Sequence, residues 1–197
     1  MVRLQRQNKG IYCLETYRWY GSKDESSVEP ILELLHKSHK KVPYMRRDVA
    51  TLEEFTYFLH QYLRPGYDNY PILHLSFHGD DDPPGIILDD KNTKVSLGNL
   101  EELIDGRCKD RIIYFGSCST MNEHGRRLSS FRSRTGALAV CGFRQAVGWL
   151  TSAAFETLVL SGLQDVRFTK KGIERFDRRL KEEAPGLYRT LGFRLVV

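Results

Sequence analysis

The sequence predicts an α/β fold, arranged as a three-layer α/β/α sandwich around a mostly parallel six-stranded sheet with a small hairpin insertion. Three observations lead to this prediction. Apolar runs of strand length alternate with segments of helical periodicity along the chain, which is typical of α/β folds. Residues 70–77 are almost continuously apolar or β-favouring, as in a central strand that is covered on both faces. No repeat, low-complexity tract or long Gly/Ser/Pro linker interrupts the alternation.

Length and composition indicate one globular domain over residues 1–197. We expect its main core at about residues 10–163, with a C-terminal helix and a final strand in residues 164–197. With 41% hydrophobic and 28% charged residues, the chain has the composition of a folded protein. Much of the excess behind the formal net charge of +5 falls in the last third of the chain. We interpret this charge as a solvated basic face and do not expect nucleic acid as a direct ligand.

The sequence also bears on location and redox state. No apolar run approaches the ~20 residues that span a bilayer, and residues 1–9 lack the apolar stretch of a signal peptide. We therefore expect a cytoplasmic protein without membrane contact. Its four cysteines lie far apart without CxxC spacing, which predicts reduced thiols and neither a disulfide framework nor a zinc site. Neither a metal nor a cofactor is expected.

Strands and helices can be placed in order along the chain. Strands are expected at residues 10–17, 41–48, 70–77, 110–115, 136–143 and 193–197. Helices are expected from residue 28, from residue 52, at 97–104, after residue 120, at 147–163 and at 171–183. Thr51 and Glu54 form a capping-box pattern before the second helix. Residues 85–88 and 93–96 are expected to form a hairpin with a polar turn at 89–92.

Two strand ends carry the residues that could perform chemistry. His78 follows the strand at 70–77 and Cys118 follows the strand at 110–115, and a right-handed crossover would make these two strands neighbours. In an open parallel sheet, ligands bind beyond the carboxyl ends of the strands, so both side chains should face one crevice. A cysteine attacks an amide as its thiolate, which a nearby imidazole and a helix N-terminus stabilise. We therefore predict a catalytic dyad of His78 and Cys118.

The flanking residues complete this hypothesis. Ser119 or Thr120 is expected to cap the helix after Cys118, so that the helix dipole favours the thiolate. His78 would protonate the leaving amine. Gly79 has no side chain, so a substrate carbonyl can approach its backbone N–H. Together with the N–H of Cys118, that group is expected to form an oxyanion hole.

The segments around these residues resemble the paired motifs of clan CD cysteine peptidases, the group of caspases, metacaspases, gingipains, separases and CHAT proteases. Residues 73–80 resemble the apolar strand followed by His-Gly, and residues 112–120 resemble the strand that ends in the nucleophile. The order of the motifs, their separation (118 − 78 = 40) and the strand context match over about residues 10–163. The small and polar flanks of Cys118 resemble the bacterial CHAT-like branch.

This resemblance implies a caspase-like sandwich with cysteine endopeptidase activity on a protein or peptide substrate. For the bacterial branch it further implies a role in a defence or cell-death system and an activating partner protein. Both implications are analogies from the fold family to this chain.

Specificity is not carried over by the resemblance. Gly116 stands where metacaspases have an acidic residue that recognises a basic P1 side chain, the side chain before the scissile bond. The caspase pentapeptide around the nucleophile is also absent, so the aspartate preference of caspases is not transferred either. The resemblance implies that Gly142, Phe143 and Arg144 border the S1 pocket, where Arg144 would select an acidic P1 residue. Asp80, beside the first motif, is a further candidate substrate contact.

Other interpretations stay open at this point. A non-catalytic caspase-like interaction module would keep the fold with a blocked pocket. A regulatory domain that uses the basic C-terminal third would bind nucleic acid with a salt-dependent affinity. His74 and His78 lie four residues apart on one strand face and could form half of a metal site, although no third-ligand motif lies nearby. The acidic residues 80–82 also fit a solvated loop.

Overall fold

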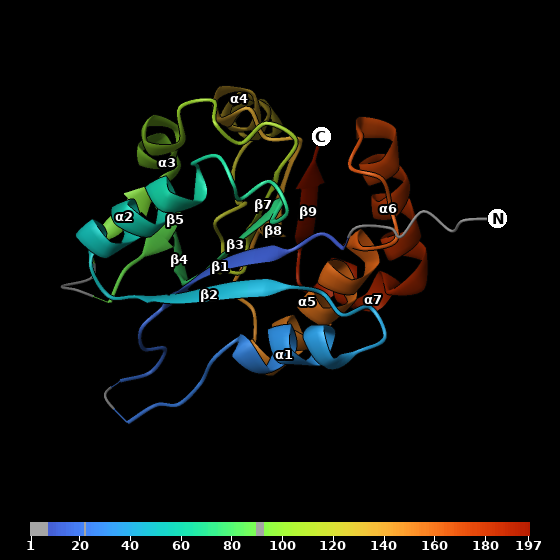
Figure 1. The fold of residues 1–197 in the computed structure, drawn as a ribbon, viewed down its shortest axis with the longest axis horizontal. Helices are drawn as coiled ribbons and strands as arrows, with labels where there is room; N and C mark the ends of the chain where they lie inside the picture. Colours follow the sequence, from blue (N-terminus) through green and yellow to red (C-terminus); the bar gives the residue numbers. More distant parts are fainter. Residues whose placement is uncertain (1–7, 22, 90–92) are drawn as a thin grey trace.

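The structure, a computed structural model, describes residues 8–21, 23–89 and 93–197. Its centre is a six-stranded sheet in the order β2-β1-β3-β7-β8-β9 (Figure 1). The strands are β1 (Ile11–Thr16), β2 (Tyr44–Val49), β3 (Ile72–Ser76), β7 (Ile112–Phe115), β8 (Ala139–Phe143) and β9 (Phe193–Val196). All neighbours are parallel except β9, which runs antiparallel to β8. The predicted α/β fold with a mostly parallel six-stranded sheet is confirmed.

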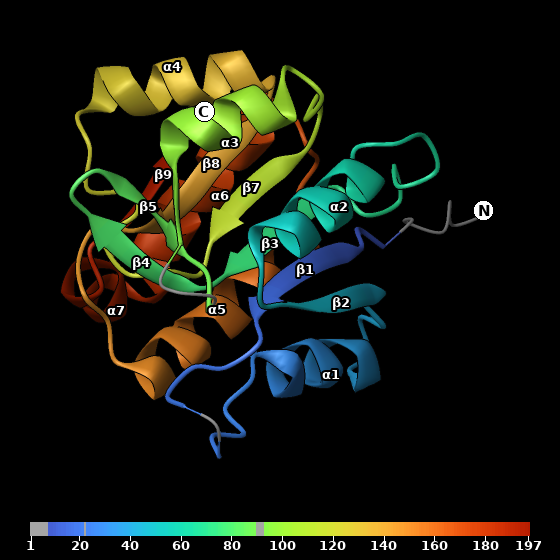
Figure 2. The same cartoon turned by 90° about the vertical axis from the view of Figure 1, so that its left-hand side faces the viewer.

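Helices cover both faces of this sheet (Figure 2). One face carries α2 (Leu52–Tyr62), α3 (Leu97–Ile104) and α4 (Gly125–Thr135), and the other carries α1 (Glu29–Lys37), α5 (Trp149–Leu163), α6 (Lys170–Glu183) and α7 (Pro185–Thr190). A separate cluster of buried apolar side chains fills the space on each side. Since β1, β3, β7 and β8 are buried along their whole length, their sequences are largely apolar and lack the alternation of half-exposed strands.

Most elements lie where the sequence predicts them, within a few residues. The capping box of α2 is confirmed, because the Glu54 N–H donates to Thr51 Oγ1 and the Thr51 N–H donates to Glu54 Oε2, both at 3.2 Å. Helix α7 was not predicted. It has six residues and none of them is buried, so it leaves no apolar periodicity in the sequence.

The expected hairpin is part of a larger unit. Strands β5 (Pro84–Ile87) and β6 (Lys94–Ser96) pair antiparallel, and β4 (His78–Asp81) adds a third strand on the other side of β5. The predicted turn at 89–92 lies outside the described residues except for Asp89. His78 therefore begins β4 instead of ending β3, and it lies where the chain passes from the large sheet to the small one.

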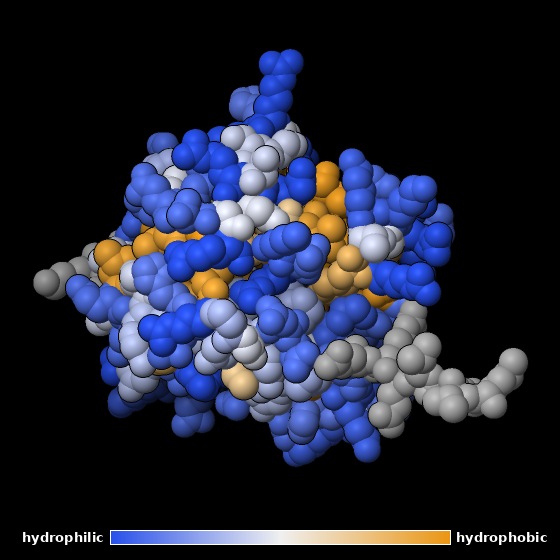
Figure 3. All heavy atoms as spheres, turned by 45° about the horizontal axis from the view of Figure 1, so that its top comes forward, coloured by the Kyte–Doolittle hydropathy of each residue, from blue (hydrophilic) through white to orange (hydrophobic). Residues whose placement is uncertain are grey.

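The surface is mainly polar. The face that carries α2, α3 and α4 is largely hydrophilic, with apolar patches showing between the polar groups (Figure 3). In the part of the chain that the structure describes, no helix combines the length and the apolar character that crossing a membrane requires. The longest of these helices, α5, has 15 residues.

Candidate functional site

The structure brings His78 and Cys118 to one pocket. Leu75 in β3 pairs with Phe115 in β7, and His78 and Cys118 each follow their strand's paired residue by three positions. The two side chains line the same cavity of about 50 Å³. The backbones are in close contact there, because a Cβ atom built on Gly79 would lie 1.8 Å from the carbonyl oxygen of Cys118. Glycine at position 79 is what allows the two strand ends to meet.

His78 has a fixed orientation. Its Nε2 lies 2.5 Å from the carbonyl oxygen of Trp19, and the ring also packs edge-on against the side chains of Trp19 and Tyr20. A carbonyl oxygen can only accept a hydrogen bond, so Nε2 must carry the proton. Nδ1 is then the ring nitrogen that can accept a proton during a reaction.

Cys118 differs from the other cysteines in exposure. Its side chain is partly exposed, and the Val147 N–H points at Sγ from 3.4 Å, a contact that stabilises negative charge on sulfur. The remaining three cysteines are buried. Burial raises the pKa of Cys108 to about 12 and raises the pKa of Cys13 and that of Cys141 well above the ordinary range. Cys118 is therefore the thiol that is open to reaction.

The helix at the sulfur is not the one expected from the sequence. Helix α4 begins only at Gly125, with His124 as its N-cap, so neither Ser119 nor Thr120 caps it. Thr120 instead bonds to Ser117 Oγ at 2.6 Å and to the carbonyl of Gly85 at 3.0 Å, which ties this loop to β5. A helix dipole acts over its first turn only, so α4 begins too late in the chain to act on Cys118.

The helix N-terminus that lies at the Cys118 sulfur is that of α5. Val147, whose N–H reaches Cys118 Sγ, lies just before the first residue of the helix, Trp149. Trp149, Ser152 and Ala153 from the first turn and a half of α5 line the pocket. The positive end of this helix dipole therefore lies at the site and favours an anion there.

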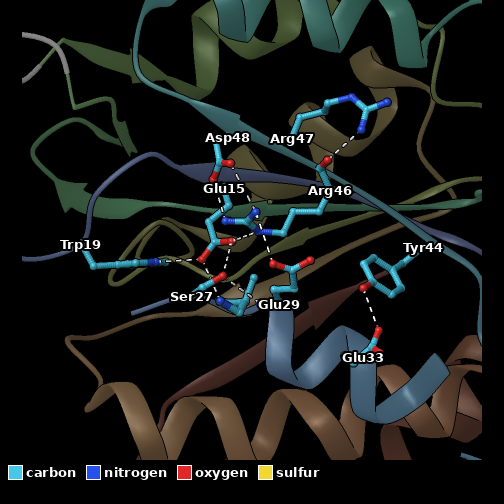
Figure 4. Close-up of polar contacts among 10 residues, drawn as sticks. Glu15, Trp19, Ser27, Glu29, Glu33, Tyr44, Arg46, Arg47 and Asp48 are labelled. Carbon is cyan, nitrogen blue, oxygen red and sulfur yellow. Dashed lines mark hydrogen bonds and ion pairs between the residues drawn. The ribbon is translucent and has the colours of Figure 1, made fainter. Parts of the chain in front are cut away.

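A buried carboxylate holds the pocket wall that carries Trp19 (Figure 4). Glu15 in β1 is fully buried and accepts hydrogen bonds from Trp19 Nε1 at 2.9 Å, Ser27 Oγ at 2.9 Å and the Val28 N–H at 2.7 Å. It also forms an ion pair with Arg46 of β2. These bonds tie both ends of the segment after β1 to the sheet, and this segment presents the carbonyl that orients His78.

We expect Glu15→Gln to lower the free energy of unfolding by about 3 kcal/mol, since it removes one partner of a buried, hydrogen-bonded ion pair. It should also lower peptide turnover if the site is catalytic, because Trp19 loses its anchor. Glu33→Gln is the matched control, since Glu33 pairs with Lys37 on the exposed surface of α1 and its loss should change stability little. Urea denaturation of both variants measures the difference. Equal stabilities would contradict this account of Glu15.

The predicted substrate contacts lie elsewhere. Asp80 pairs with Lys94 at 2.8 Å, and this contact lowers the pKa of Asp80. Gly142 and Phe143 are buried in β8, where Phe143 packs in the core. Arg144 lines a separate hollow with residues of the 81–84 and 122–125 loops. None of the four lines the pocket of Cys118, which the chain after β8 reaches only at Val147.

Two polar residues of the pocket were not anticipated. Ser76, at the end of β3, and Glu156, in the middle of α5, both line it and are almost completely buried. Glu156 Oε2 lies 3.2 Å from His74 Nε2, but the geometry is not that of a hydrogen bond. The Oγ of Ser76 has no hydrogen-bond partner among the described residues. The only sequence signal for Glu156 is a single acid within the largely apolar segment 147–163.

The two histidines of β3 and β4 do not form a shared site. His74 faces Glu156 and His78 faces the carbonyl of Trp19. Across residues 8–21, 23–89 and 93–197, no group of three His, Cys, Asp or Glu side chains is arranged to hold a metal ion.

The comparisons with known proteins give a family without an assigned function. No curated protein matches the chain. The match that is found is to DUF6642, described as a family of unknown function, and it extends over residues 8–197. Since this is nearly the whole sequence, the chain belongs to the DUF6642 family.

Proposed function

We propose that the protein is a cysteine endopeptidase with a caspase-like fold, in which Cys118 is the nucleophile and His78 transfers protons. One observation carries the proposal: the only partly exposed thiol among the described cysteines shares a pocket with an imidazole whose Nε2 is bonded to the Trp19 carbonyl. Such a base, held by a third group, is the arrangement that activates nucleophiles in hydrolases. The resemblance of both strand-end segments to clan CD peptidases supports the same assignment.

In the proposed reaction, Nδ1 of His78 accepts the proton of the Cys118 thiol. The thiolate sulfur forms a bond to the substrate carbonyl carbon, and the π electron pair moves to the oxygen. When this intermediate collapses, the C–N bond breaks and His78 gives its proton to the leaving amine, which leaves a thioester on Cys118. His78 then takes a proton from water as the oxygen bonds to the thioester carbon, the C–S bond breaks, and the displaced sulfur takes the proton back from His78 as the acid product leaves.

The negatively charged oxygen of the tetrahedral intermediate requires hydrogen-bond donors. We assign this role to the backbone N–H groups of Gly79 and Cys118, whose backbones are in contact. The N-terminus of α5 supplies further positive potential to the pocket.

Exposed apolar side chains near the pocket support a polypeptide substrate. Tyr20 lines the pocket and is 65% exposed, and Leu150, next to the pocket residue Trp149, is 78% exposed. Apolar groups left in water beside a site are typical of surfaces that contact other proteins.

Digestion of a proteome-derived peptide library, before and after treatment with iodoacetamide, tests the function. Because the other thiols are buried and have raised pKa values, the reagent should modify Cys118 first at neutral pH. We expect cleavage by the untreated protein and its loss in proportion to Cys118 alkylation, measured by intact mass and peptide mapping. A Cys108→Ala variant should behave as the wild type. A library left intact by the untreated protein, or cleavage that persists when Cys118 is fully alkylated, would count against the peptidase and for a non-catalytic module.

A further inference from the structure

The described lining of the pocket beside Cys118 holds a single acidic side chain. Of the described residues that line it, Glu156 is the only carboxylate, and neither lysine nor arginine is among them. His78 and Cys118 line the pocket from the strand ends, whereas Glu156 comes from the middle of α5. Aromatic side chains of Trp19, Tyr20 and Trp149 line the same cavity. A carboxylate within an aromatic enclosure is suited to a cationic group.

Glu156 lacks the partners that a buried carboxylate normally has. Its side chain is 3% exposed, and its Oε2 atom has no hydrogen-bond partner among the described residues, only the 3.2 Å contact with His74 Nε2. Burying a carboxylate without hydrogen bonds is costly, so the group requires an explanation. Ser76 adds an unpartnered hydroxyl to the same pocket.

Gly116 lets His74 and Glu156 pack against the backbone of the strand end that leads to Cys118. A Cβ atom at this position would lie 2.7 Å from His74 Nε2 and 3.3 Å from Glu156 Oε1. Gly116 also lines the pocket two residues before Cys118, so the thiol and the Glu156 carboxylate face the same cavity. A cavity of about 50 Å³ holds roughly three to five waters, which suits a slender side chain better than a bulky ring.

We propose that this pocket receives the side chain of a lysine or arginine residue, with Glu156 as the anionic partner and Ser76 as a further acceptor, so that the protein cleaves after basic residues. The inference rests on the proposed function and adds its substrate class. It replaces the expectation that Arg144 selects an acidic residue, because Arg144 does not line this pocket.

Peptidyl chloromethyl ketones that differ only in the P1 residue test the inference without requiring turnover. The Cys118 thiolate displaces chloride, so a C–S bond forms as the C–Cl bond breaks, and intact-protein mass spectrometry gives the rate. Reagents with lysine and arginine should label Cys118 roughly ten- to a hundredfold faster than the reagent with norleucine, the range expected for a hydrogen bond to a charged group. The lysine and arginine rates also show which cation fits better.

Glu156→Gln should bring the ratio of the lysine and norleucine rates close to one. Both rates are measured on the same variant, so a change in the reactivity of Cys118 itself cancels in the ratio. Glu101→Gln is the control, because Glu101 is similarly buried but lies on α3 and pairs with Arg127 and Arg134. It should keep the wild-type ratio. A ratio that survives Glu156→Gln would overturn the inference and would leave Glu156 as a partner of His74 only.

Labelling of the wild-type protein alone also tests the inference, whether or not Glu156→Gln folds. If norleucine or aspartate at P1 labels Cys118 as fast as lysine, or if only iodoacetamide labels it, the inference is wrong. If the basic reagents label selectively but no peptide is cut, the pocket assignment stands and the proposed peptidase fails. The two claims can therefore fail separately.

Discussion

Cys118→Ala is expected to lower the rate of peptide cleavage on the order of a millionfold, which places it below detection, as for removal of a nucleophile in other hydrolases. The reason is that no other described thiol reaches the pocket. His78→Ala should cost a similar factor, because the base and the nucleophile act as a unit. The double variant should then be no slower than either single variant.

Initial rates with a fluorogenic peptide that carries a cleaved sequence measure these effects, and thermal unfolding shows whether each variant is folded. Cys108→Ala provides the control, since that thiol is buried and away from the pocket. Additive losses from the two substitutions would mean that Cys118 and His78 do not work together. An unchanged rate in Cys118→Ala would exclude it as the nucleophile.

The second large effect is expected from Gly79→Ala. The added methyl group would lie 1.8 Å from the Cys118 carbonyl oxygen and 2.9 Å from its nitrogen, so the two strand ends must separate. A displacement of about 1 Å in a catalytic group costs roughly a hundredfold in rate, and we expect kcat/KM to fall at least that far. Gly186→Ala is the control, because a Cβ atom there meets nothing within 4 Å and the residue is helical. Normal activity in Gly79→Ala would contradict the close approach of the two backbones.

Strand ends were the most predictable part of this site. The apolar segments before His78 and Cys118 predict buried strands, and parallel pairing places both residues at one edge of the sheet. The sequence could not show that the Trp19 carbonyl holds the imidazole, because a backbone atom has no sequence signature. Glu15 anchors the segment after β1, and its only sequence signal is a charged residue within a largely apolar strand.

The errors of prediction share a physical cause. Ser119 and Thr120 have the composition of a helix cap, but Ser119 adopts a left-handed conformation with φ of 57° and the chain turns before α4 begins. Phe143 is the last residue of β8, and its ring packs in the core against Phe155 and Phe193. It therefore cannot also line the pocket. In both cases tertiary packing, and not the local sequence pattern, decides where the residue lies.

The central claim is that Cys118 forms a covalent bond to the carbonyl carbon of a cleaved peptide. Rapid mixing with a peptide that ends in a good leaving group, followed by acid quenching and peptide mapping, detects this bond directly. The account predicts a mass increase on Cys118 equal to the acyl part of the peptide, present in the wild type and absent in Cys118→Ala. Cleavage without any acyl group on Cys118, or an acyl group on another residue, would contradict it.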